Sequence, residues 1–131
     1  MTTRIATCSC GQLIATVSAE PVRVSICHCL ACQRRTGSVF GVQARFPAGT
    51  VKVTGESHEF ARTGDEGGTG RFRFCPTCGT TVCWRLDALP DVVYIPVGAF
   101  ADPMFPPPAV SVYESRRHAW VRLPRGVKHH D

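Results

Sequence analysis

The chain has 131 residues, a formal net charge of +5, 44% hydrophobic and 19% charged residues, and eight cysteines. This length predicts a single domain over 1–131, and the composition is that of a folded protein rather than a disordered one. No apolar run approaches the ~18 residues of a transmembrane helix, and the N-terminal residues do not resemble a secretory signal. We therefore expect a cytoplasmic protein with no membrane partner. A nucleic-acid partner is not expected either, because the basic residues are scattered along the chain.

Short alternating segments dominate the sequence and predict an all-β fold with little helix. Residues 12–18 place Leu13, Ala15 and Val17 on one face, as a half-buried strand would. Helix is expected only for one or two turns after Cys29. The breaker residues 47–49 predict a hairpin between their flanking strands. Strands are expected, in chain order, at 12–18, 23–27, 39–46, 50–54, 70–74, 80–86, 92–97, 110–114 and 119–123.

Three further segments predict irregular structure. Residues 64–70 are glycine-rich but lack the following Lys-Ser/Thr and helix of a phosphate-binding loop. Residues 101–109 are proline-rich and predict a stiff surface connection. The tail 129–131 predicts a frayed end. The large aromatic residues are expected in the core or lining a pocket: Phe40, Phe46, Phe72, Phe74, Trp84 and Trp120.

The cysteines fall into groups with metal-ligand spacing. Cys75 and Cys78 form a C-x-x-C turn, in which both sulfurs can approach one ion at ~2.3 Å. Clustered thiols in a reducing compartment favour metal binding over disulfides. The lone Cys83 is expected to be a small buried hydrophobic residue. The other two groups are the pair Cys8 and Cys10, and the trio Cys27, Cys29 and Cys32.

Counting ligands favours one arrangement of two zinc sites. If Cys8 and Cys10 join Cys75 and Cys78, one four-cysteine structural site is complete and the trio stays together. If a pair from the trio joins Cys75 and Cys78 instead, three thiols are left without a site. Three ligands with an open position are typical of catalytic zinc, and a three-thiolate site suits a soft thiolate guest. The alternative is that His28 closes the second site, although strand alternation would turn its side chain away.

Three motifs in this order, CSCGQL, CHCLACQRRTGSVF and RFCPTCGTTV, resemble the glutathione-dependent formaldehyde-activating enzyme family, which also includes centromere protein V. The resemblance covers about 8–124 and implies a β-tent fold of packed antiparallel sheets with two zinc ions. It implies a structural site at Cys8, Cys10, Cys75 and Cys78, and a catalytic site at the trio. The implied activity is that of a carbon–sulfur lyase, which combines formaldehyde and glutathione into S-hydroxymethylglutathione. The sequence departs from the family at Ser111, where relatives often have a histidine.

Residues that follow the trio are candidates for ligand binding. Arg34 and Arg35 could bind the carboxylates of glutathione, since arginine binds carboxylate bidentately, or they could be solvated charges. Ser38 could hydrogen-bond a ligand or cap a turn. No carboxylate pair or G-x-S-x-G motif suggests other chemistry. The leading hypothesis is a zinc-dependent carbon–sulfur lyase acting on an adduct of glutathione or another small thiol. The alternatives are a non-enzymatic zinc-stabilised module that binds protein or nucleic acid, and a metal-exchange or redox site.

Overall fold

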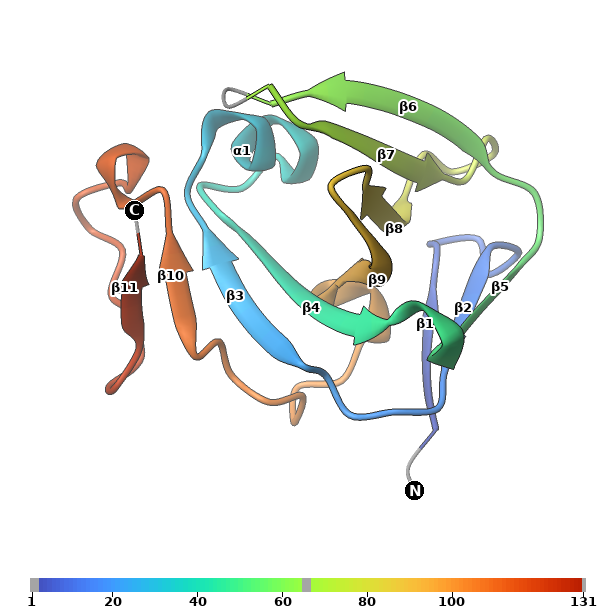
Figure 1. Ribbon diagram of the computed structural model, residues 1–131, viewed down its shortest axis with the longest axis horizontal. Coiled ribbons are helices and arrows are strands. Elements are labelled where there is room, and N and C mark those ends of the chain that lie inside the picture. The colour runs from blue at the N-terminus through green and yellow to red at the C-terminus, as the bar shows by residue number, and fades with distance from the viewer. Residues whose placement is uncertain (1–2, 65–66, 131) are drawn as a thin grey trace.

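A computed structural model describes residues 3–64 and 67–130, and within them the fold is mostly β with one α-helix (Figure 1). The smaller sheet has the strand order β1-β2-β5, and the larger has the order β11-β10-β3-β4-β9-β8-β7-β6. The expected all-β fold with little helix is confirmed. The elements are β1 (Arg4–Thr7), β2 (Ile14–Val17), β3 (Arg23–Cys27), α1 (Leu30–Thr36), β4 (Gly41–Pro47), η1 (Ala48–Thr50), β5 (Val51–Thr54), β6 (His58–Thr63), β7 (Thr69–Phe74), β8 (Thr81–Leu86), β9 (Leu89–Pro96), η2 (Val97–Phe100), β10 (Val110–Val112), η3 (Glu114–Arg116) and β11 (Lys128–His130).

The core lies between the two sheets and follows from strand alternation. On the smaller sheet's side, Leu13, Ala15 and Val17 are fully buried, as their period of two predicts. On the larger sheet's side, Ala44 and Phe46 of β4 belong to the same cluster. Fully burying each large apolar side chain contributes about 1.5–3 kcal/mol. The core therefore fixes which face of β3 and β4 points away from the smaller sheet.

The opposite face of the larger sheet carries polar side chains. Arg23, Ser25 and Cys27 alternate with the apolar residues Val24 and Ile26 along β3, and Gln43 and Arg45 alternate with apolar residues of β4 in the same way. The two strands are antiparallel and in register, with Arg23 opposite Arg45 and Ser25 opposite Gln43. Figure 1 shows this sheet curving, so that β7 lies across from β3 and β4 with α1 at one end. The polar face is therefore the concave one.

The prediction of a hairpin around 47–49 is wrong. η1 carries the chain from β4 in the larger sheet to β5, which pairs with β2 in the smaller one. Both edges of β4 are already occupied, by β3 and by β9. A strand has only two edges for hydrogen bonding, so β5 cannot pair with β4.

Other expectations near the C-terminus also need correction. The strand expected at 119–123 is absent from the described structure, where residues 119–120 form a turn, residues 121–123 have no regular structure and Val121 is buried. Trp120 is 67% exposed, contrary to its expected place in the core or a pocket. The tail expected to fray instead forms β11, which pairs in parallel with β10; residue 131 lies outside the described residues. β10 also runs parallel to β3, so the larger sheet is not wholly antiparallel.

The loops expected at 64–70 and 101–109 are partly confirmed. The first is the turn between β6 and β7, although residues 69–70 belong to β7 and residues 65–66 lie outside the described ranges. The second has no regular structure, but it is anchored by Phe105, which is buried and stacks on Phe100 with ring centroids 4.8 Å apart. Among the described residues, no helix is long and apolar enough to cross a membrane.

Candidate metal centres and the adjoining cavity

The first candidate metal centre joins two turns that are distant in the sequence. Cys8 and Cys10 lie between β1 and β2, and Cys75 and Cys78 lie between β7 and β8; all four sulfurs lie within 4.8 Å of one another. The Cys10 sulfur lies 3.6 Å from those of Cys8 and Cys75. Four sulfurs at ~2.3 Å from one tetrahedral zinc would be ~3.8 Å apart. The cluster therefore fits a structural zinc ion, with the ligand set expected from the sequence.

Hydrogen bonds surround the sulfurs of this cluster. The Gln12 side-chain amide donates to the Cys75 sulfur at 3.0 Å. Hydrogen bonds from the side chain and the backbone of Thr80 lower the pKa of Cys78 to about 5. Donors aimed at sulfur favour the thiolate, which is the form that binds zinc. Both the hydrogen bonds to the sulfurs and the distances between the sulfurs therefore suit a metal–thiolate site.

Gly55 packs against the residue that contacts this cluster. It has φ +99°, and a Cβ on it would lie 2.1 Å from the Gln12 carbonyl oxygen. The Gln12 side-chain amide also donates to the Glu56 carbonyl oxygen at 2.7 Å and accepts from the Glu56 backbone N–H at 2.8 Å. We expect Gly55→Ala to lower the free energy of unfolding by roughly 2–4 kcal/mol, from left-handed strain and overpacking. Chemical denaturation measures this, with Gly49→Ala as control because its Cβ would meet nothing within 4 Å. Equal stability of the two variants would contradict the expectation.

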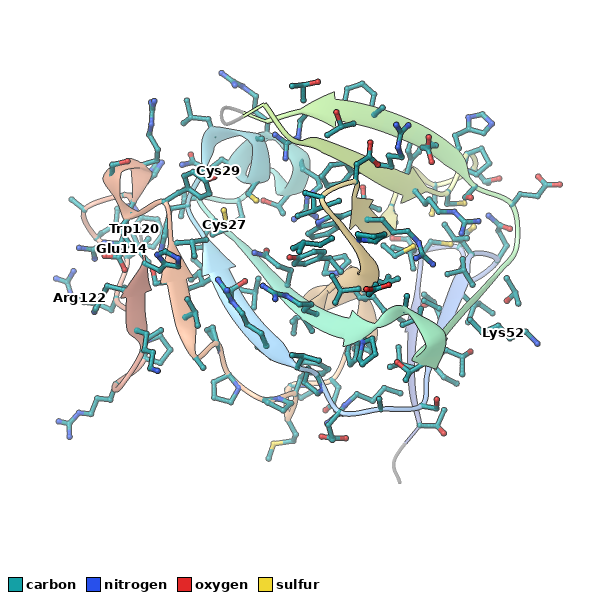
Figure 2. All side chains as sticks on the ribbon, viewed as in Figure 1. Cys27, Cys29, Lys52, Glu114, Trp120 and Arg122 are labelled. Carbon is teal, nitrogen blue, oxygen red and sulfur yellow. The ribbon has the colours of Figure 1, made fainter. Side chains whose placement is uncertain are left out.

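The second candidate metal centre is the trio, which is built on one short stretch of chain. Cys27 ends β3, Cys29 is the N-cap of α1, and Cys32 lies in the first turn of α1. Their sulfurs lie within 4.8 Å of one another, and Figure 2 shows Cys27 and Cys29 side by side near the start of α1. The Cys29 sulfur accepts a hydrogen bond from the Cys32 backbone N–H at 3.3 Å, as an N-cap residue does. The strand-to-helix turn therefore gathers the three sulfurs.

The three thiols influence one another's ionisation. Hydrogen bonds from Cys27 and Cys32 lower the pKa of Cys29 to about 2, with a smaller contribution from the positive charge of Arg62. The pKa of Cys27 is raised by its hydrogen bonds to the sulfurs of Cys29 and Cys32, and by burial. The hydrogen bonds within the trio therefore favour ionisation of one sulfur over ionisation of all three. A cation would be needed for all three to ionise together, which is the form of a three-thiolate metal site.

No further histidine, cysteine or carboxylate joins the trio among the described residues. His28 is fully buried, and its Nε2 lies 3.1 Å from the Ser111 hydroxyl. Burial lowers the pKa of His28 and keeps it neutral. Ser111 therefore serves as the polar partner of a buried imidazole. Cys83, as expected, is buried outside both clusters, and burial raises its pKa.

A cavity of about 720 Å³ lies beside the trio, and all three cysteines line it. Its volume is within the ~300–1,000 Å³ of typical ligand sites. Of the residues expected to bind ligand, Arg34 lines this cavity. The Arg35 guanidinium instead lies over the Trp84 ring, 4.6 Å from its centroid. Ser38 is exposed after α1, is not among the residues lining the cavity, and its backbone N–H donates to Thr36.

Several residues that line the cavity were not expected from the sequence. Arg23 and Ser25 share the face of Cys27 because all three alternate along β3, so the period of two was an available signal. Gln43 and Arg45 could be placed only once β4 was known to pair with β3. His130 also lines the cavity, from β11. No local motif marks it.

These features define a mostly β protein with two cysteine clusters that could hold metal ions, one of four ligands and one of three that borders a cavity. The model of the glutathione-dependent formaldehyde-activating enzyme family matches residues 3–116, and the chain belongs to this family. A search of curated proteins finds no match. The crystal structure of a Rhodobacter sphaeroides protein is similar, with a TM-score of 0.59, 20% identity, and coverage of 76% of this chain and 91% of that one. At 20% identity the likeness to this structure shows the fold alone. β11 lies beyond residues 3–116, which the family model matches.

Proposed function

We propose that the protein is a zinc-dependent carbon–sulfur lyase acting on the adduct of a small thiol, such as glutathione, with formaldehyde. One observation carries the proposal: a three-cysteine cluster, with no fourth ligand among the described residues, borders a cavity of about 720 Å³. The four-cysteine cluster, by contrast, has a complete ligand set of its own. This difference in ligand number supports a structural role for the four-cysteine cluster and a chemical role for the trio.

The trio would hold the zinc of the reaction. A zinc ion there would supply a Lewis-acid position that favours the deprotonated form of an incoming thiol. In the synthetic direction a bond forms between the thiol sulfur and the carbonyl carbon, and the carbonyl π bond breaks. The thiol proton ends on the new hydroxyl oxygen. No oxidant or reductant is required, so the second substrate is the aldehyde alone.

The chain itself would orient the thiol through its charges. Arg34 lines the cavity that the trio borders, and in the described residues it forms no ion pair. Arg62 lines the same cavity and lies over the Phe72 ring, 5.3 Å from its centroid. A guanidinium binds carboxylate strongly and bidentately. We therefore assign Arg34 and Arg62 to binding the carboxylates of the thiol.

The proposed activity can be measured directly by NMR exchange between formaldehyde and glutathione. Protein loaded with two zinc ions per chain is expected to accelerate exchange above the uncatalysed rate. The same protein stripped of zinc is the control for catalysis by the chain alone. If fully loaded protein gives no acceleration, the lyase activity is excluded. Failure to bind glutathione in calorimetry as well would then favour the non-enzymatic binding module.

A further inference from the structure

The cavity has a second polar end, away from the trio. Arg23 lies four residues before Cys27 on the same face of β3, which places it about 13 Å farther along the strand. Arg45 lies directly opposite Arg23 on β4, and both residues line the cavity. Side chains directly opposite in an antiparallel pair are close neighbours. Two guanidinium groups therefore share one end of the cavity.

This pair of charges has no compensation within the described structure. Over 3–64 and 67–130, neither Arg23 nor Arg45 forms an ion pair, and no carboxylate lines the cavity. The Nε atoms of both arginines are buried without a hydrogen-bond partner. Like charges directly opposite in a sheet destabilise it, and a buried donor without an acceptor does so too. Packing alone does not account for such an arrangement.

The neighbouring groups fix the position of the pair. The Arg45 guanidinium lies over the Tyr94 ring, 5.6 Å from its centroid. Beside it, the Gln43 amide donates to the Ser25 hydroxyl at 2.9 Å. These contacts leave the arginine Nε donors free. An acceptor-only anion would satisfy the donors and offset both charges.

We propose that Arg23 and Arg45 form an anion subsite, which binds a carboxylate or phosphoryl group at the far end of an elongated ligand. The sulfur end of that ligand would lie at the trio, on the order of 10 Å away. The stacked rings of Phe72, Trp84 and Tyr94 line the same cavity. The substrate class is thus a thiol with a distant anionic terminus. This link to a thiol rests on the proposed function, whereas the binding of an anion does not.

The test uses the zinc-loaded protein and three probes: inorganic phosphate, succinate and the neutral thiol 2-mercaptoethanol. We expect phosphate or succinate to bind at one per chain, and Arg23→Gln or Arg45→Gln to weaken that binding by about tenfold or more. Binding of 2-mercaptoethanol should not change, and Arg23→Lys should restore part of the anion affinity. The probe that binds more tightly identifies a phosphoryl or a carboxylate ligand. Arg85→Gln is the matched control, because Arg85 is exposed on β8 and does not line the cavity.

Two results would overturn the subsite: neither anion binds, or both glutamine variants bind anions as tightly as the unchanged protein. These results test the subsite independently of the proposed lyase activity. If the anion affinity depends on Arg23 and Arg45 but formaldehyde exchange is not accelerated, the subsite stands and the lyase does not. If exchange is accelerated and the glutamine variants behave as the unchanged protein, the lyase stands and the subsite does not.

Discussion

Replacing Cys75 by serine is expected to unfold the domain at temperatures where the unchanged protein is folded. Cys75 is fully buried, and its cluster joins the β1–β2 turn to the β7–β8 turn. A structural zinc site supplies an apparent ~10–16 kcal/mol, which is coupled to folding and exceeds the stability of most small domains. Thermal unfolding monitored by circular dichroism, together with zinc content, measures the effect. A strong chelator added to the unchanged protein should reproduce it.

Cys83→Ala is the matched control for this variant. Cys83 is also buried in the core, but it belongs to neither cluster. Its loss is expected to cost about 1 kcal/mol and to leave zinc content unchanged. If Cys75→Ser and Cys83→Ala were equally stable, the four-cysteine cluster would not be a structural metal site.

Cys29→Ser is expected to abolish the proposed lyase activity while the fold remains. Serine is a preferred N-cap, so it keeps the cap of α1 that the Cys29 sulfur provides while removing a thiolate from the trio. Changes around metal ligands lower affinity or activity by roughly 10–100-fold, so loss of a ligand should cost at least ~100-fold. The measurements are formaldehyde exchange by NMR and zinc content, which should fall from two ions to one. The circular dichroism spectrum should not change.

The assignment of roles to the two clusters depends on this contrast. If Cys29→Ser kept full activity with one zinc ion per chain, the trio would not be the site of the chemistry. If the variant instead unfolded like Cys75→Ser, the trio would be structural as well. Cys83→Ala serves again as the control, because it removes a thiol that belongs to neither cluster.

Much of the site could be predicted because its information is local. The spacings of Cys27, Cys29 and Cys32, and of Cys75 and Cys78, restrict where the sulfurs can lie. Counting ligands then joined Cys8 and Cys10 to the second pair, and the structure brings those four together. Alternation likewise predicted the buried face of β2. The spacings and the alternation each span only a few residues, whereas joining the two cysteine pairs required a count of ligands over the whole chain.

The remaining features of the fold and of the cavity depend on which strands pair with one another, and no local sequence pattern encodes strand pairing. The Arg23–Arg45 pair exists only because β3 and β4 are antiparallel in one particular register. The expected hairpin at 47–49 failed because β9, more than forty residues later, occupies the edge of β4. β6 was not predicted, since its exposed residues show no alternation of apolar and polar side chains. Contacts of this kind are decided by the whole sheet.

The position of β11 has a practical consequence for how the protein is handled. His130 lines the cavity that the trio borders, and it lies opposite Val112 of β10, which in turn lies opposite Cys27 of β3. A polyhistidine affinity tag fused to the C-terminus would place additional imidazoles next to thiolates that are proposed to hold zinc. Imidazole is itself a good zinc ligand, so such a tag would compete for the metal or complete its coordination. Tags for assays of this protein therefore belong at the other terminus.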